Sequence, residues 1–172
     1  MSNSPYFCCN YLKAKNMTQS QLKRILEPEV MDTWEESIAY DAMDFTEVNA
    51  AFAEQAVALG PIAGRILDIG TGPARIPVLM AQLRSQWQIV GIDLSRNMLK
   101  LGDRHVQISG LSDRIQLELI DAKQMPYADA SFDFVVSNSI VHHLPDPLLC
   151  WREIRRILKP NGGLFVRDLL RP

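Results

Sequence analysis

The 172-residue chain is long enough for one domain, and its 47% hydrophobic residues can build a substantial core. A net charge of −2 with scattered lysines and arginines gives no reason to expect a nucleic-acid partner or an anionic membrane partner. Apolar runs stay well below the roughly 20 residues of a membrane span. Residues 1–16 lack the apolar stretch of a secretory signal, and three cysteines do not make a disulfide framework. We therefore expect a cytoplasmic protein with Cys150 as a small buried hydrophobic side chain.

The pattern of the chain predicts a tail and one domain. Residues 1–25 are predicted to be a flexible tail, and residues 26–172 a single domain. Within that domain, residues 26–61 are expected to form a helical cap and residues 62–172 an α/β core.

Two helices are predicted in the cap. Thr33 and Glu36 fit a capping box, so the first helix begins near Trp34. Tyr40 on this helix is either a packed aromatic residue or a lid residue over a ligand pocket. A second helix ends at the Gly60-Pro61 pair. It is expected to bury one face made of Val48, Phe52, Ala56 and Leu59.

Residues 65–77 read as a strand, a tight glycine turn and a helix. The short apolar run from Ile66 to Ile69 stops at Gly70-Thr71-Gly72. After Pro73 the apolar residues have near-helical spacing, at Ile76, Leu79, Met80 and Leu83. Such a turn lets the backbone approach a ligand closely and presents N–H groups at a helix start.

The remaining chain alternates strands and helices. Strands are predicted over residues 88–93, 115–120, 131–136 and 164–168. One helix is capped by Ser95 and carries Met98, Leu99 and Leu101. Another starts at Asp146-Pro147, has Trp151, Ile154 and Leu158 on one face, and is followed by a turn over residues 159–163. This alternation predicts an α/β fold with a Rossmann-like, doubly wound, mostly parallel sheet and helices on both faces.

Candidate ligand residues follow the predicted strands. Four of the five strands end at Gly70, Asp93, Asp121 or Asn138. Because the carboxyl ends of parallel strands share one edge of a sheet, these residues are expected to lie together. Ligands bind at that edge in open α/β sheets, so the coincidence predicts a binding site.

The glycine turn departs from two common phosphate-binding motifs. A dinucleotide fingerprint has Gly or Ala where this chain has Arg75, and the Gly-Lys-Ser/Thr of a phosphate-binding loop is absent. Asp68, just before the turn, would repel a pyrophosphate and suits a cationic ligand.

The following strand ends suit a nucleoside. Asp93 is placed to accept hydrogen bonds from ribose hydroxyls, and Asp121 can accept one from an exocyclic amine. Leu94 and Met98 can supply apolar faces for a purine. Together with Asp68, these residues indicate a nucleoside with a positively charged appendage.

At this point residues 62–168 resemble a known family. The resemblance rests on Asp68-x-Gly70-x-Gly72, Asp93, Asp121-Ala122, Phe-Asp-x-Val-x-Ser-Asn138 with His-His-Leu nearby, and Leu-Lys-Pro-x-Gly-Gly163. In this order the motifs are similar to those of class I S-adenosylmethionine-dependent methyltransferases, and specifically to the methyltransferase-11 or ubiquinone/menaquinone C-methyltransferase group.

The resemblance implies a cofactor, S-adenosyl-L-methionine, and a small-molecule methyl acceptor. It implies that Asp68, Gly70, Thr71 and Gly72 line the methionine part, Asp93 holds the ribose, Leu94 and Met98 sandwich the adenine, Asp121 and Ala122 recognise its edge, and Asn138 faces the reacting centre. No metal site is expected, and the catalytic residues are unknown.

The family pattern has seven strands and closes with a C-terminal antiparallel hairpin, which is missing after strand five here. Strand five is thus predicted to be an exposed edge strand. The chain is then a fragment, a truncated product, or a protein whose homodimer covers this edge. A truncated, catalytically inactive module that binds S-adenosylmethionine or a partner is therefore an alternative. A nicotinamide-dependent oxidoreductase is a third reading, and Arg75 argues against it.

No residue identifies itself as a general base. His142 and His143 are expected in an extended segment, where adjacent side chains point opposite ways and make a poor metal pair. Their alternatives are packing, a pocket wall or a base, and Tyr127 is another candidate base. Arginines are expected to form a solvated helix face at Arg152, Arg155 and Arg156.

Overall fold

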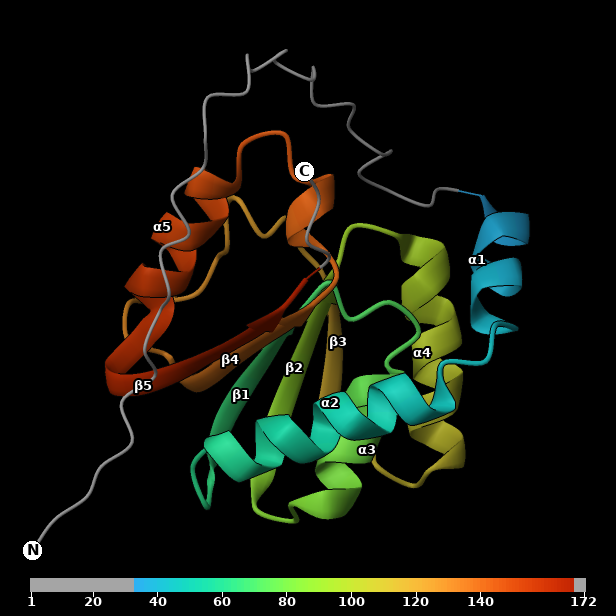
Figure 1. Cartoon of the computed structure of the whole chain (residues 1–172), viewed down its shortest axis with the longest axis horizontal. Helices are drawn as coiled ribbons and strands as arrows, with labels where there is room; N and C mark the ends of the chain where they lie inside the picture. Colours follow the sequence, from blue (N-terminus) through green and yellow to red (C-terminus); the bar gives the residue numbers. More distant parts are fainter. Residues whose placement is uncertain (1–32, 169–172) are drawn as a thin grey trace, which may run out of the picture.

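The computed structural model describes residues 33–168 (Figure 1). The predicted tail, the first residues of the cap and residues 169–172 lie outside the described residues. The elements follow in the order α1 (Trp34–Asp41), α2 (Thr46–Leu59), β1 (Gly64–Ile69), α3 (Arg75–Leu83), β2 (Trp87–Asp93), α4 (Arg96–Ile108), β3 (Ile115–Leu119), β4 (Phe132–Asn138), the 3-10 turn η1 (Val141–His143), α5 (Pro147–Ile157) and β5 (Leu158–Arg167).

Within residues 33–168 the strands form one five-stranded sheet in the order β3-β2-β1-β4-β5. All neighbours are parallel, and β1 lies at the centre, with Ile66 opposite Ile89 of β2 and Phe134 of β4. Helices α2, α3 and α4 cover one face of the sheet and α5 covers the other (Figure 1). The strand order reverses between β1 and β4, which is the crevice where open α/β sheets bind ligands. The predicted α/β class and Rossmann-like sheet are confirmed.

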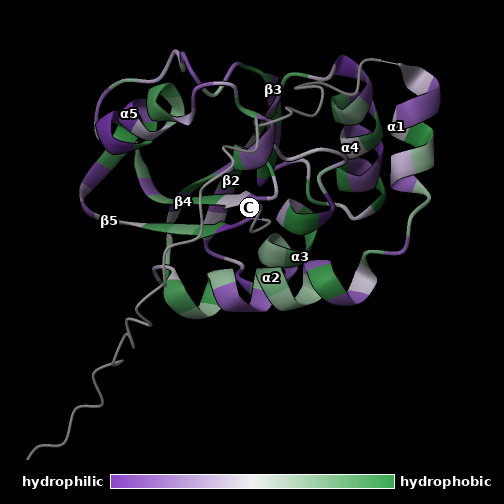
Figure 2. Ribbon diagram, turned by 45° about the horizontal axis from the view of Figure 1, so that its top comes forward, coloured by the Kyte–Doolittle hydropathy of each residue, from purple (hydrophilic) through white to green (hydrophobic). Residues whose placement is uncertain are grey.

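Two hydrophobic clusters hold the sheet between its layers. The first joins α2 and α3 to the sheet and contains the fully buried rings of Phe52 and Trp87. The second lies under α5 and contains Cys150, which is buried as predicted. Burial raises the pKa of the Cys150 thiol to about 11, so this cysteine behaves as an apolar group. The apolar stripes of α3 and α5 turn inward in Figure 2.

Three predicted helix starts are present, each with its capping bond. Thr33 and Glu36 form the reciprocal capping box of α1. The Ser95 hydroxyl accepts from the Met98 N–H at the start of α4, and Asp146 caps α5 with Pro147 in the first turn. These starts follow from local hydrogen bonding, which explains why the sequence predicted them.

The predicted apolar face of α2 is partly wrong, whereas the predicted helix after Pro73 is present as α3. Helix α2 buries Phe52, Ala53 and Ala56, whereas Val48 and Leu59 are 52% and 67% exposed. Leu83 at the end of α3 is also exposed, and α3 buries Pro77, Val78, Met80 and Ala81. Helices α2 and α3 pack against each other as well as on the sheet, so small alanine side chains replace larger ones at the contact.

The predicted turn over residues 159–163 is wrong, as is the assignment of Leu158 to the preceding helix. Helix α5 ends at Ile157, and β5 begins at Leu158. Leu158 pairs with Phe132 and Gly163 with Phe134, so the register shifts between the two pairs. The extra residues of β5 bulge out of the hydrogen-bond ladder between the two strands. Turn-forming residues allow such a bulge without ending the strand.

Candidate functional site at the carboxyl edge of the sheet

The glycine turn follows β1 and is tied to β2. The N–H groups of Gly70 and Thr71 both donate to the Ile92 carbonyl, over 2.9 and 3.0 Å. Gly70 has a φ of +73°, and a Cβ there would lie 2.0 Å from Cγ2 of Ile140. Gly72 has a φ of +53°, and among the described residues no atom lies within 4 Å of where its Cβ would be. Gly70 is therefore required by packing, whereas the space beside Gly72 is open to a ligand.

Asp93 at the end of β2 fixes the shape of this turn. Its Oδ2 accepts from the Gly72 N–H at 2.8 Å, and its Oδ1 accepts from the Ser95 N–H at 2.9 Å. Burial raises the pKa of Asp93 above its usual range, and the backbone donors oppose this shift. Each carboxylate oxygen has a further lone pair, so Asp93 can position the turn and still accept from a ligand hydroxyl.

Two buried polar atoms next to the turn lack a hydrogen-bond partner among residues 33–168. They are Oδ2 of Asp68 and Oγ1 of Thr71, whose residues are 2% and 6% exposed. Burial raises the pKa of Asp68 to about 7; the neighbouring Thr71 hydroxyl opposes this shift, and the charge of Asp93 adds to it. An unpaired buried carboxyl is costly, so the site is complementary to a ligand that brings a positive charge or a donor.

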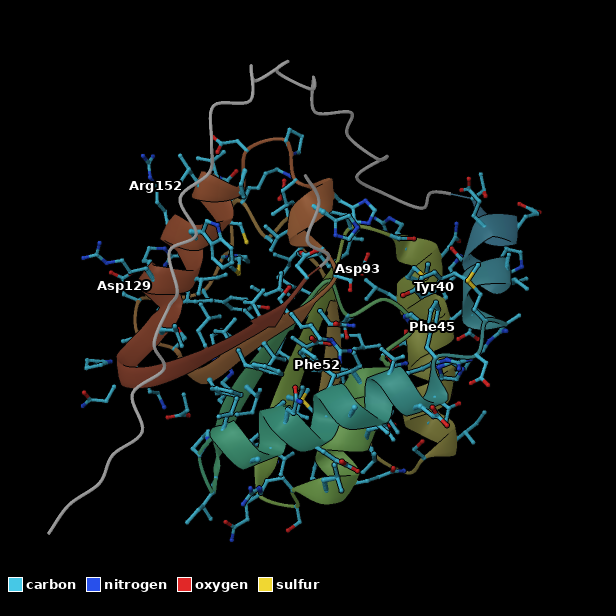
Figure 3. The ribbon with its side chains drawn as sticks, in the orientation of Figure 1. Tyr40, Phe45, Phe52, Asp93, Asp129 and Arg152 are labelled. Atoms are coloured by element: carbon cyan, nitrogen blue, oxygen red, sulfur yellow. The ribbon has the colours of Figure 1, made fainter. Side chains whose placement is uncertain are left out.

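A small cavity of about 40 Å³ lies above the turn. It is lined by Tyr40, Phe45, Asn49, Gly70, Thr71, Gly72, Pro73, Arg75, Ile76 and Asn138. Tyr40 and Phe45 lie near Asp93, far from the labelled Arg152 (Figure 3). Their ring centroids are 5.2 Å apart, and burial raises the pKa of the Tyr40 phenol. Tyr40 thus lines the cavity and also packs against Phe45, so both interpretations of this residue stay open.

The predicted adenine residues lie beside this cavity rather than in its wall. The Ile120 N–H donates to the Asp93 carbonyl at 3.1 Å, which brings the end of β3 next to the end of β2. Asp121 accepts from the Lys123 N–H and pairs with its ammonium at 3.1 Å. Leu94 is half-buried, whereas Met98 and Ala122 are buried. Gly70, Thr71, Gly72 and Asn138 are thus brought into one cavity wall, and the other predicted site residues are not part of that wall.

Asn138 ends β4 and is positioned by an arginine that the sequence did not single out. Its side-chain oxygen accepts from Nε of Arg167 at 3.0 Å. Arg167 also donates to the Val48 carbonyl and lies over the ring of Phe52 at 4.9 Å. These partners are distant in sequence, so no local pattern could have revealed them.

The expectation of an extended segment at His142 and His143 is wrong. Both lie in η1, and their ring centroids are 4.1 Å apart. Nδ1 of His142 lies 2.5 Å from Oδ1 of Asp168, whose Oδ2 accepts from the Val141 N–H at 2.6 Å. Asp168 was missed as a site residue, although it follows β5 and therefore obeys the same strand-end rule as the other candidates.

The remaining expectations concern Tyr127 and the arginines of α5. The Tyr127 hydroxyl donates to Glu118 at 2.8 Å and lies outside the cavity wall, which does not favour a role as base. Arg152 and Arg155 are exposed as predicted. Arg156 is not simply solvated, because it pairs with Glu153 and Asp129 and donates to two backbone carbonyls. In the described part of the chain, no group of three or more His, Cys, Asp or Glu residues could hold a metal ion, and no helix could cross a membrane.

The parallel sheet, the glycine turn and the acid that ends β2 define a Rossmann-like domain with a candidate ligand site at the carboxyl edge of its sheet. Comparison with known families matches residues 67–166 to the model described as a methyltransferase domain, and the chain belongs to this family.

Curated relatives include the methyltransferase GfsG of Streptomyces halstedii, which is 34% identical over 106 residues, or 62% of this chain and 38% of that protein. A demethylmenaquinone methyltransferase of Bacillus velezensis is 34% identical over 111 residues, or 63% of this chain and 46% of that protein. The chain therefore spans less than half the length of these two relatives.

Among solved structures, a putative S-adenosylmethionine-dependent methyltransferase of Methanococcus maripaludis superposes with a TM-score of 0.75 at 26% identity. The match covers 89% of this chain and 68% of that one.

Proposed function

We propose that this chain catalyses S-adenosylmethionine-dependent methyl transfer to a small-molecule acceptor. The observation that carries the proposal is the buried carboxyl of Asp68, whose Oδ2 lacks a partner among the described residues, next to a glycine turn whose open side faces a cavity. S-adenosylmethionine is a nucleoside with a sulfonium and an ammonium group, and it would compensate this carboxyl. Both relatives described above are methyltransferases by name, which favours transfer over an inactive binding module.

The residues present fit this cofactor in two groups. Asp68, Thr71, Gly72 and Asn138 would hold the methionine part, with Gly70 shaping the turn. Asp93 would accept from the ribose hydroxyls, and the adenine would lie against Leu94, Met98, Asp121 and Ala122. When bound, the cofactor would supply a methyl group carried on a positively charged sulfur. The acceptor atom would bond to the methyl carbon, and the sulfur would leave as a neutral thioether.

The protein then orients the acceptor and removes its proton. We assign the proton transfer to His142, since its Nδ1 is held by Asp168 at the same edge of the sheet as Asn138. The Asp168 carboxylate would fix the ring and stabilise the imidazolium that forms when His142 takes a hydroxyl proton. Tyr40 and Phe45 would cover the reacting centre and exclude water.

Calorimetric titration of the full chain tests the proposal. We expect micromolar binding of S-adenosylmethionine and of S-adenosylhomocysteine, and no binding of NAD as the control nucleotide. A folded chain, judged by circular dichroism, that binds neither sulfur nucleoside would contradict the proposal. Binding of NAD alone would instead favour the hypothesis of a nicotinamide-dependent oxidoreductase.

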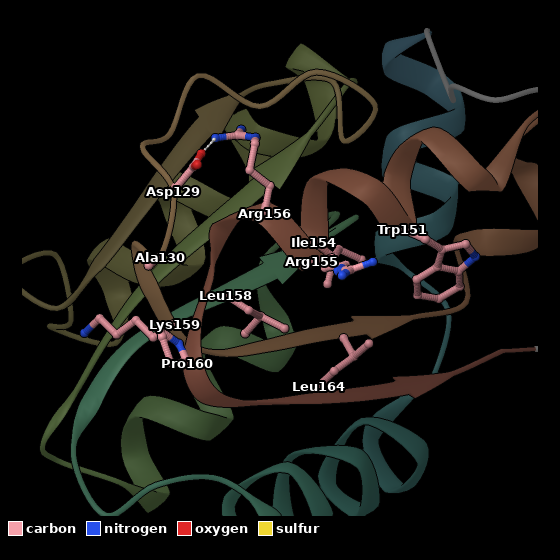
Figure 4. Close-up of a pocket in the computed structure, with 10 residues that line it drawn as sticks. All are labelled: Asp129, Ala130, Trp151, Ile154, Arg155, Arg156, Leu158, Lys159, Pro160 and Leu164. Carbon is pink, nitrogen blue, oxygen red and sulfur yellow. Dashed lines mark hydrogen bonds and ion pairs between the residues drawn. The ribbon is translucent and has the colours of Figure 1, made fainter.

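A homodimer that covers β5 is proposed as the assembly. Among the described strands β5 is an edge, with Leu164 44% exposed. A groove of about 480 Å³ lies between α5 and β5 (Figure 4), lined by Asp129, Ala130, Trp151, Ile154, Arg155, Arg156, Leu158, Lys159, Pro160 and Leu164. A second copy would pair the edge and fill this groove. A cytoplasmic location remains a prediction, in keeping with the free thiol of Cys150.

A further inference from the structure

The side-chain amide of Asn138 has one orientation, which its neighbour on the next strand imposes. Asn138 ends β4 and pairs in register with Arg167, which ends β5. Nε of Arg167 donates to the side-chain oxygen of Asn138 at 3.0 Å, and the Ser139 hydroxyl approaches the same oxygen at 3.5 Å. A guanidinium has N–H groups and no acceptor, so it can bond only to the oxygen of an amide. Arg167 therefore keeps this oxygen on its own side and turns the NH2 group of Asn138 away from β5.

Arg167 is itself held by the cap and by the backbone. Its Nη2 donates to the Val48 carbonyl of α2 at 3.0 Å, and its guanidinium lies 4.9 Å from the centre of the fully buried Phe52 ring. The Ser139 N–H donates to the Arg167 carbonyl at 2.8 Å, which ties the chain after β4 to the end of β5. The orientation of the Asn138 amide is therefore set before any ligand binds.

The amide nitrogen of Asn138 is the group that remains for a ligand. It makes no hydrogen bond to residues 33–168, whereas the amide oxygen is occupied by Arg167. The described residues that line the cavity include Asn138 but no carboxylate, since Asp68 is not part of this wall. The charged residue of the wall is Arg75, a cation that pairs with Asp41 at 2.9 Å. The wall beside Asn138 therefore suits a ligand atom that develops negative charge.

The residue after Arg167 holds the proposed base. Oδ1 of Asp168 lies 2.5 Å from Nδ1 of His142, so consecutive residues at the end of β5 position Asn138 and His142. An acceptor hydroxyl that gives its proton to His142 develops negative charge on its oxygen, and a fixed N–H donor stabilises that charge. An amine acceptor develops positive charge during methyl transfer, which N–H donors do not stabilise.

We propose that Arg167 is a positioning residue that aims the NH2 group of Asn138 at the methyl acceptor, so that Asn138 donates to the acceptor oxygen and the site favours hydroxyl over amine acceptors. This inference rests on the proposed function and names the acceptor class of the same site. In the transfer step the acceptor O–H bond breaks, and its proton goes to Nε2 of His142. The acceptor oxygen forms its bond to the methyl carbon as the carbon–sulfur bond breaks, and the electron pair of that bond stays on sulfur.

Acceptor pairs that differ only in the reacting atom test the inference. Phenol is compared with aniline, and cyclohexanol with cyclohexylamine, on the full chain at saturating S-adenosylmethionine. Release of S-adenosylhomocysteine gives the rate, and the mass of the product identifies the methylated acceptor. We expect the hydroxyl member of a pair to react faster than the amine by about 10-fold or more. Asn138→Asp replaces the NH2 group by oxygen and should lower kcat for the hydroxyl member by about 100- to 1,000-fold, as for the loss of one donor to an oxyanion.

Variants of Arg167 separate positioning from a structural role. Arg167→Met removes the donors but keeps an aliphatic stem over Phe52, so the amide can turn. For the hydroxyl member kcat should then fall about 10-fold, while KM and the affinity for S-adenosylhomocysteine change by less than about twofold. Arg167→Lys keeps a side chain that can only donate, and it should restore most of kcat. Arg84→Met is the matched control and should leave kcat unchanged, because Arg84 also donates to a carbonyl of α2, that of Val57, and lies over the Trp87 ring, but outside the cavity wall.

The outcomes separate this inference from the proposed function. Loss of kcat in Arg167→Met, with recovery in Arg167→Lys, supports the inference. Equal rates for the two members of a pair, or an unchanged kcat in Asn138→Asp, overturn it and leave the proposed function standing. Equal losses in Arg167→Met and Arg84→Met mean that both arginines only anchor α2, which also overturns it. A chain that binds S-adenosylmethionine but methylates no member of either pair overturns the inference, and a folded chain that binds no S-adenosylmethionine overturns the proposed function as well.

Discussion

The cavity at the carboxyl edge of the sheet and the groove between α5 and β5 are two hollows of the described chain, and they differ in volume and in whether their polar groups have partners. The groove is large, about 480 Å³, but three of its four charged residues have partners: Arg156 pairs with Asp129, and Lys159 pairs with Asp133. The cavity at the carboxyl edge is only about 40 Å³, yet it adjoins the unpaired oxygens of Asp68 and Thr71.

The difference teaches that unsatisfied chemistry locates this site better than volume does. A groove with partnered charges and apolar walls is a packing surface, which another polypeptide can fill. Unpaired buried polar atoms lower the free energy of unfolding, and a chain retains them where a bound ligand supplies the missing partners. Four substitutions test this contrast.

The largest effect is expected from His142→Gln, which removes the proposed base at the carboxyl edge. The turnover rate should fall by roughly 100- to 10,000-fold, the usual contribution of a positioned base. The affinity for S-adenosylhomocysteine should stay within about twofold, because the product is bound through other residues. Methyl-transfer kinetics and calorimetry measure the two quantities. His143→Gln keeps the bond between His142 and Asp168 and serves as the control; an equal loss in that variant would argue against the assignment.

Asp93→Ala is expected to weaken S-adenosylhomocysteine binding by about 100-fold. The change removes acceptors for the ribose hydroxyls and the anchor of the Gly72 N–H. Asp129→Ala is the matched control, since this carboxylate is 79% exposed at the rim of the groove. Unchanged affinity in Asp93→Ala would mean that the end of β2 does not meet the ligand.

Asp68→Asn should affect stability and affinity in opposite directions. The pKa of Asp68 is about 7 in the folded protein against an ordinary 3.8, so the folded chain binds one more proton than the unfolded chain between these values. The unfolding free energy therefore decreases as the pH rises through this window and is lowest above it. At about pH 8 the variant should gain roughly 2 kcal/mol of stability, and no more than the three-unit shift allows. Its affinity for S-adenosylhomocysteine should fall about 10-fold.

Thermal melts at about pH 5 and about pH 8 check the stability prediction, and calorimetry checks the affinity. A melting temperature that varies with pH equally in the wild type and in Asp68→Asn would show that this carboxyl does not titrate in the folded state. Since a bound ammonium favours the carboxylate, binding to the wild type near neutral pH should also release a proton.

The smallest effect on the cofactor site is expected from Leu164→Glu in the groove. The charge would disfavour a dimer across β5 and shift the sedimentation coefficient to that of a monomer. Cofactor affinity should stay within about twofold because the carboxyl edge is untouched. Leu148→Glu on exposed α5 lies outside the groove and is the control. A wild-type chain that is already monomeric would remove the proposed dimer.

Local signals explain which elements were predictable. Thr33, Ser95 and Asp146 mark helix starts through hydrogen bonds that span two or three residues. The strand ends at Asp93, Asp121 and Asn138 follow from hydrophobic runs that stop at a polar residue. Because every strand of a parallel sheet ends at the same edge, strand order alone places such residues together.

By itself, therefore, the sequence determined the alternating fold, the helix caps and the strand-end residues, since each depends on residues close in the chain. The tertiary structure alone decided which apolar residues of α2 face the sheet, that β5 continues through residues 158–163, and that Asp168 reaches His142. It also decided that Asp41 holds Arg75 at the cavity. These contacts join segments separated by 26 or more residues, and their geometry is set by how layers pack, which no local pattern contains.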